Sequence, residues 1–133
     1  MDKNDGRVVT NFINQMLDDN DITIYGDGSQ TRSFCYIDDL LEGIIKLMNI
    51  SYIYPVNIGN NTELTIKEIV DILKEMIKPS SKIIYKQLPE DDPTNRKPDI
   101  SLAKELLNWK PTINVEQGFL RTIMYFSEQK LTK

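Results

Sequence analysis

Apolar residues recur three or four positions apart in five stretches of the chain, and this spacing predicts five amphipathic helices. The clearest begins after Thr65, because Thr65 and Glu68 have the spacing of a capping box, and Pro79 ends it. Asp38 and Asn114 are the expected N-caps of two others. The five stretches are residues 8–17, 40–48, 66–77, 102–107 and 115–126.

Four shorter stretches have the alternation and the β-branched or aromatic content of strands. They are residues 22–25, 33–37, 55–58 and 82–86. A turn at Gly26-Asp27-Gly28 ends the first of them. Strands that alternate with helices indicate an α/β fold. Four strands of this length do not make a convincing sheet of their own, so we expect this chain to be part of an α/β protein.

Composition excludes several classes of function. The 133 residues suffice for about one domain, and the net charge of −4 disfavours general binding to nucleic acid or to an anionic membrane. No apolar run approaches the roughly 18 residues of a membrane span, and no signal peptide opens the chain. The single cysteine, Cys35, permits no disulfide within the chain and fits a reducing compartment, so a cytoplasmic protein is expected.

The chain contains no histidine. This excludes Ser-His-Asp and Cys-His catalysis and makes a zinc site of the usual kind improbable, so no metal site is expected. Three of the four arginines, Arg7, Arg32 and Arg96, lie in segments that contain glycine or proline. A guanidinium group binds phosphate as a rigid fork, so these positions suggest an anion site, although ordinary surface arginines would give the same pattern.

Five segments of this sequence together resemble one enzyme family. They are residues 4–12 (NDGRVVTNF), 24–36 (IYGDGSQTRSFCY), 55–60 (PVNIGN), 91–100 (DDPTNRKPDI) and 107–111 (LNWKP). The family is that of the extended short-chain dehydrogenase/reductase enzymes acting on sugar nucleotides, within the NAD-dependent epimerase/dehydratase superfamily. The first and fourth segments resemble most closely its UDP-glucuronate decarboxylases, also called UDP-xylose synthases.

The resemblance implies a fold and a reaction. The fold is the carboxyl-terminal substrate-binding lobe, residues 1–133 as a single lobe, with the last strands and helices of an incomplete Rossmann-type domain. The complete enzyme is a dimer that uses NAD to convert UDP-glucuronate into UDP-xylose and carbon dioxide. The cofactor supplies the redox chemistry, and the protein supplies position and proton transfer.

The resemblance also implies roles for particular residues. Arg32 and Arg96 match arginines that hold the pyrophosphate or ribose of a UDP-sugar, and Arg7 is a third candidate. Tyr25 and Gln30 match contacts to uracil or ribose, against the alternatives of a half-buried strand tyrosine and a turn glutamine. Val8 would approach the base through backbone groups. For the pair Asp38 and Asp39, a helix cap is the better interpretation than a carboxylate site.

Two parts of that family's machinery are missing from this sequence. Only Gly26 and Gly28 lie close together, without the third glycine of the dinucleotide fingerprint, and no tyrosine is followed four positions later by lysine. We therefore expect part of an enzyme: a truncated product, half of a split enzyme with a separate NAD-binding chain, or an excised domain. Alone it would neither bind NAD tightly nor turn over substrate. A non-catalytic UDP-sugar module, a degenerate remnant, and a lobe of a related epimerase or dehydratase remain alternatives.

Overall fold

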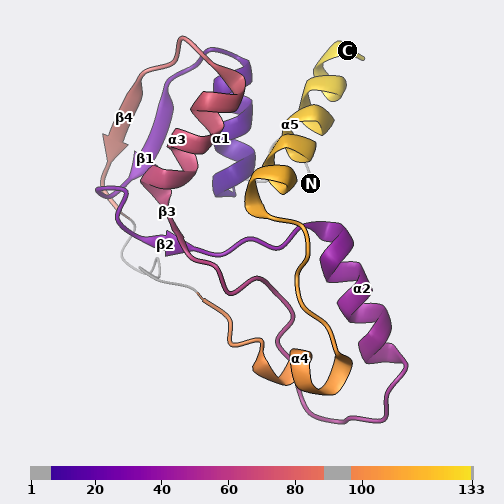
Figure 1. Ribbon diagram of the computed structural model, residues 1–133. Coiled ribbons are helices and arrows are strands. Elements are labelled where there is room, and N and C mark those ends of the chain that lie inside the picture. The colour runs from indigo at the N-terminus through magenta and orange to yellow at the C-terminus, as the bar shows by residue number, and fades with distance from the viewer. Residues whose placement is uncertain (1–6, 89–96, 133) are drawn as a thin grey trace.

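Helices and strands are interspersed along the chain, which confirms the predicted α/β class (Figure 1). The computed structural model describes residues 7–88 and 97–132. The helices are α1 (Val8–Leu17), α2 (Ile37–Met48), α3 (Ile66–Ile77), α4 (Ser101–Leu107) and α5 (Val115–Leu131). The strands are β1 (Ile22–Tyr25), β2 (Thr31–Arg32), β3 (Leu64–Thr65) and β4 (Ile83–Lys86).

The described strands form two separate pairs instead of one sheet. β1 pairs with β4 in parallel, with Ile22 opposite Ile83. β2 pairs antiparallel with β3, with Arg32 opposite Leu64. This confirms that the predicted strands are too few and too short to build an extended sheet by themselves.

The larger core lies between α1, α3 and α5 and the inner side of β1 (Figure 1). Ile13, Ile24 and Leu73 are among its completely buried side chains. The predicted capping box holds the start of α3: Thr65 Oγ1 accepts a hydrogen bond from the Glu68 N–H at 3.1 Å, and the Glu68 carboxylate accepts one from the Thr65 N–H at 2.7 Å. Because both ends of this helix are defined locally, its position follows directly from the sequence.

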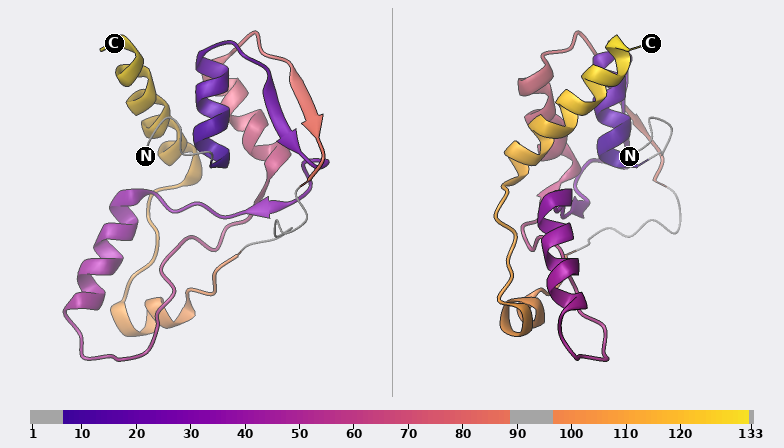
Figure 2. Two further views of the ribbon diagram at one scale, coloured as in Figure 1. Left: turned by 180° about the vertical axis from the view of Figure 1, so that it is seen from behind. Right: turned by 90° about the vertical axis from the view of Figure 1, so that its right-hand side faces the viewer.

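A smaller core lies apart from the first, between α2 and α4 (Figure 2). Its centre is Trp109, whose indole N–H donates to the carbonyl oxygen of Asp39 at 2.9 Å. Gly43 on α2 allows the close approach, because a Cβ there would lie 3.2 Å from Trp109 Cε2 and 2.7 Å from Ile58 Cγ2. The absence of a side chain at Gly43 therefore sets the distance between α2 and the indole ring.

Two predicted strands and one predicted cap are wrong. Residues 33–37 are not a strand, because β2 pairs at Thr31–Arg32 and α2 begins at Ile37. Asp38 accordingly lies inside α2, and the N-cap is Tyr36, without a side-chain cap. Residues 55–58 are not assigned as a strand either, because no strand of the described ranges pairs with them. By contrast, the predicted cap Asn114 is confirmed, since its side chain accepts from the Gln117 N–H at 2.8 Å.

Candidate functional site

Four of the six predicted site residues line one hollow on the surface, which we call the Arg32 hollow. Its volume is about 70 Å³. It is lined by Val8, Asn11, Phe12, Thr23, Tyr25, Gln30, Arg32 and Ile66. The predicted residues Val8, Tyr25, Gln30 and Arg32 thus come together from α1, β1, β2 and the turn between the two strands.

Arg32 is the cationic group of this hollow. It lies on β2, and its Nη1 donates to the carbonyl oxygen of Thr31 at 2.7 Å. The side chain is half-buried, so its planar fork is partly withdrawn from bulk water, where charge–charge attraction is weakest. A guanidinium in this setting is suited to a bidentate contact with a phosphate group.

Gln30 lines the hollow, and the glycine turn lies between it and Tyr25 in the chain. Gly26 and Gly28 have φ angles of 80° and 83°, in the left-handed region that other residues seldom adopt. Gln30 is buried; its side-chain amide donates to the carbonyl oxygen of Tyr25, and its own backbone carbonyl accepts from the Ile66 N–H at 2.9 Å. Gln30 therefore ties the turn to α3. The ring of Tyr25 is exposed and stands at the rim.

Of the two remaining predicted arginines, the structure describes only Arg7. Arg7 is the N-cap residue of α1, where its carbonyl oxygen accepts from the Asn11 N–H at 2.8 Å. It is exposed and does not line the Arg32 hollow. Arg96 lies outside the described residues, so its predicted role stays a prediction.

The sequence interpretation missed two polar residues of the hollow, Asn11 and Thr23. Asn11 follows Val8 by three positions, and residues three apart share one face of a helix, so this neighbour was detectable from the sequence. Thr23 was not, because its N–H donates to the Gln15 side chain at 3.1 Å, a contact that depends on how α1 packs on β1.

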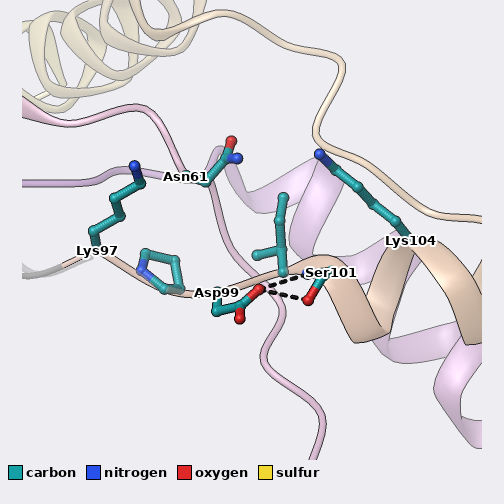
Figure 3. Close-up of a pocket in the computed structure, with 7 residues that line it drawn as sticks. Asn61, Lys97, Asp99, Ser101 and Lys104 are labelled. Atoms are coloured by element: carbon teal, nitrogen blue, oxygen red, sulfur yellow. Dashed lines mark hydrogen bonds between the residues drawn. The ribbon is translucent and has the colours of Figure 1, made fainter.

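A second, larger hollow of about 270 Å³ lies at the start of α4 (Figure 3). Lys97 and Lys104 approach it from opposite sides of Asn61. Asp99 also lines it, and its carboxylate accepts from the N–H and the hydroxyl of Ser101 at 3.0 and 2.6 Å. These bonds hold the pKa of Asp99 below its ordinary value. The carboxylate offsets one of the two lysine charges, so the hollow is only weakly cationic.

The glycine turn does not fit a dinucleotide. A dinucleotide cradle requires a strand, a glycine-rich turn and a helix whose N-terminus meets the pyrophosphate. Gly26 and Gly28 instead connect β1 to another strand, β2. Within residues 7–88 and 97–132 we also find no group of three or more acidic or cysteine side chains arranged to hold a metal ion. None of the described helices combines the length and the apolar character needed to cross a membrane.

Cys35 is expected to react slowly with iodoacetamide. Burial, and secondarily the negative charge of Asp39, raise the pKa of the Cys35 thiol from 9.0 to about 11. Because the thiolate is the reactive form, alkylation at pH 8 should be about 100-fold slower than for an ordinary free cysteine. The rate should rise about tenfold per pH unit until the pH approaches 11. Mass spectrometry of the alkylated chain measures the alkylation rate. A rate that levels off below pH 9 would contradict the raised pKa of the Cys35 thiol.

Comparisons with known proteins agree with the motifs. Residues 1–59 match the model of the NAD dependent epimerase/dehydratase family. UDP-glucuronic acid decarboxylase 1 of Arabidopsis thaliana is 46% identical over 129 residues, which are 97% of this chain and 30% of the relative. UDP-glucuronic acid decarboxylase 1 of Danio rerio is also 46% identical, over 97% of this chain and 31% of the relative. The chain thus spans about a third of the length of these curated relatives.

The fold is likewise similar to solved structures. The UDP-glucuronic acid 4-epimerase of Bacillus cereus superposes with a TM-score of 0.87 at 29% identity, over 93% of this chain and 40% of the epimerase. The UDP-glucose 4-epimerase of Thermotoga maritima superposes with a TM-score of 0.88 at 29% identity, over 92% and 40%. The motifs, the fold and the similarities agree: this chain matches the NAD dependent epimerase/dehydratase family, and it corresponds to about a third of the length of the curated relatives.

Proposed function

We propose that this chain binds the UDP part of a sugar nucleotide, as the substrate-binding, carboxyl-terminal lobe of a UDP-glucuronate decarboxylase. The observation that carries the proposal is the Arg32 hollow, in which predicted residues from two segments of the sequence, 4–12 and 24–36, lie together. The 46% identity to decarboxylases supports the choice of reaction, UDP-glucuronate to UDP-xylose and carbon dioxide. We further propose that residues 1–133 act as one lobe and that the protein works in the cytoplasm.

In this proposal Arg32 holds the diphosphate. The protein carries a net charge of −4, so attraction of the ligand has to be local. A charge-assisted contact between a guanidinium and a phosphate contributes about 1.5–3 kcal/mol. Tyr25 at the rim and the nearby backbone of Val8 would contact the uracil and ribose, and Arg7 and Arg96 would add positive charge. Gln30 acts by positioning, since its amide already bonds to Tyr25.

The volume of the hollow indicates which part of the ligand this chain can enclose and which part other residues must enclose. At about 70 Å³ it accepts one phosphate-sized group, whereas a pocket that encloses a drug-sized ligand measures about 300–1,000 Å³. The sugar and the base therefore need walls beyond the described residues. We propose that an NAD-binding domain supplies them, together with the redox chemistry and the proton transfer, while this chain binds and orients the substrate.

Replacing Arg32 by alanine is expected to weaken the binding of UDP by about 10–100-fold, because the charge-assisted contact is lost. Isothermal titration of the whole chain with UDP measures the effect. Arg121→Ala is the matched control: Arg121 lies on α5, 3.5 Å from Asp38 and over the ring of Tyr36, and its loss should leave the affinity unchanged. Equal affinities of the wild type and Arg32→Ala, or no UDP binding at all, would contradict the proposal.

A second candidate is the substrate lobe of an epimerase, favoured by the superposition on the Bacillus cereus UDP-glucuronic acid 4-epimerase. The two reactions give different products. Once the chain is combined with an NAD-binding half and supplied with UDP-glucuronate, a decarboxylase releases carbon dioxide and an epimerase retains the carboxylate. NMR of the product sugar distinguishes them. The higher identity to the decarboxylases, 46% against 29%, supports the first.

A further inference from the structure

The Arg32 hollow opens onto the face of β1 that the core does not cover. Ile22 and Ile24 of β1 point into the larger core. Because side chains alternate along a strand, Thr23 and Tyr25 point to the opposite face. Both of these residues line the Arg32 hollow. The surface next to the hollow is therefore the outward side of the β1–β4 pair.

Strand β4 extends this surface on the side of β1 away from α1 and α3 (Figure 1). In the parallel register, Ile84 lies opposite Thr23. Lys86 lies opposite Tyr25, and its backbone carbonyl accepts from the Gly26 N–H at 2.7 Å, so the pairing continues to the glycine turn. Paired residues of neighbouring strands point to the same face of a sheet. Lys86 thus lies next to Tyr25 at the rim of the Arg32 hollow.

We call Thr23, Tyr25, Ile84 and Lys86 the outward face. Tyr25 is 45% and Ile84 36% exposed, so an aromatic ring and a branched aliphatic side chain are both open to a ligand. Lys86 is exposed as well, and among the residues that the structure describes no carboxylate forms an ion pair with it. An exposed aromatic ring is a platform on which a nucleotide base stacks. A base stacked on Tyr25 would bring its edge to Lys86.

We infer that the outward face is the subsite for the uracil base, and that Lys86 determines the preference for uracil by donating a hydrogen bond to a carbonyl oxygen of the ring. This inference rests on the proposed function and adds a residue to that site. With the diphosphate at Arg32 and the base on Tyr25, the order across the surface is cation, aromatic ring, cation. A uridine nucleotide fits this order, because its phosphates and its carbonyl oxygens both accept from cations.

A lysine in this place distinguishes the two pyrimidine bases. At ring position 4, uracil presents a carbonyl oxygen, which accepts a hydrogen bond, whereas cytosine presents an amino group, which donates one. The ammonium group of Lys86 has three donors and no acceptor. It therefore bonds to uracil and meets a second donor in cytosine. Since UDP and CDP carry the same diphosphate, a difference between their affinities reports the base contact alone.

The test is isothermal titration of the whole chain with UDP and with CDP. The wild type is expected to bind UDP about 5–20-fold more tightly than CDP, because the contact to uracil is charge-assisted but lies in water. Lys86→Met keeps the length of the side chain and removes its charge. It should lower the affinity for UDP by the same factor of about 5–20 and change that for CDP by less than about twofold, so that the preference is lost.

Lys82→Met is the matched control. Lys82 directly precedes β4, is also exposed, and lies an even number of residues from Lys86, so both side chains point to the same face. Four strand residues, about 13 Å, separate the two lysines, so Lys82 removes the same charge without reaching the base. Equal losses in the two variants would assign the effect to net charge and overturn the inference. So would a wild type that binds UDP and CDP equally, or an equal loss of both nucleotides in Lys86→Met, which would place the lysine on a phosphate.

Arg32→Ala separates this inference from the proposed function. It should weaken the binding of UDP and CDP alike, because both carry the diphosphate. Such a common loss, in a protein whose wild type does not distinguish the two nucleotides, would leave the proposed function standing and end this inference. A preference for UDP that depends on Lys86, together with affinities that do not depend on Arg32, would do the reverse. Binding of neither nucleotide would end both.

Discussion

Replacing Trp109 by alanine is expected to lower the free energy of unfolding by about 3–5 kcal/mol, the usual cost of deleting a large buried aromatic side chain. Trp109 is 2% exposed and is the centre of the smaller core, in contact with Gly43 of α2 and packed with Ala103 and Leu107 of α4. Its removal leaves a cavity between two helices and deletes the indole hydrogen bond to the carbonyl oxygen of Asp39. Urea unfolding followed by circular dichroism at 222 nm measures the loss.

Trp109→Phe separates packing from hydrogen bonding in this core. Phenylalanine keeps part of the ring volume but cannot donate to the carbonyl oxygen of Asp39, so an intermediate loss of about 1–3 kcal/mol is expected. If both variants unfolded at the urea concentration of the wild type, Trp109 would not hold α2 and α4 together.

Replacing Asp39 by alanine is expected to cost about 2–5 kcal/mol, because two backbone N–H groups would lose their acceptor. Asp39 is buried, and its Oδ2 accepts from the N–H groups of Thr112 and Ile113 at 3.0 and 2.8 Å. Its Oδ1 accepts from the Thr112 hydroxyl at 2.9 Å. One carboxylate thus fixes the segment that leads from Trp109 to α5. Because the chain has a single tryptophan, indole fluorescence reports the unfolding of this variant.

Two neighbouring substitutions test the assignment. Asp39→Asn retains one carbonyl oxygen that can accept from both N–H groups, so it should lose only about 1 kcal/mol. Asp38→Ala is the exposed control: Asp38 forms a surface ion pair with Arg121 at 3.5 Å, and such pairs contribute about 0–1 kcal/mol. A loss for Asp38→Ala as large as that for Asp39→Ala would show that the charge at the start of α2, and not the contacts to 112 and 113, stabilises the protein.

The helices were predictable because their signals are local. The capping residues Thr65 and Asn114 lie within three positions of the groups that they cap, and both are found where the sequence places them. The cap expected at Asp38 failed for a tertiary reason. The chain stays extended through Tyr36, which becomes the N-cap, and Asp39 is drawn to residues 112 and 113 more than seventy positions away.

The candidate site was predictable in its residue types and not in its geometry. Arg32, Tyr25 and Gln30 were selected because segment 24–36 resembles a family that acts on sugar nucleotides, and for Arg32 also because a guanidinium group suits a phosphate. The structure adds that Gln30 is engaged with Tyr25, and that Asn11 and Thr23 complete the wall. These contacts depend on the packing of α1 against β1, which no short-range pattern encodes.

The sequence by itself determined the helices, the extended segments, the glycine turn and the family, because periodicity, caps and motif spacing act over a few residues. The tertiary structure alone decided which of these pieces meet: β1 with β4, Asp39 with residues 112 and 113, and Val8 with Arg32. Residues 55–58 show the difference most clearly. Their alternation is a strand's, but a strand is completed by hydrogen bonds to a neighbour, and pairing is a property of two segments in space.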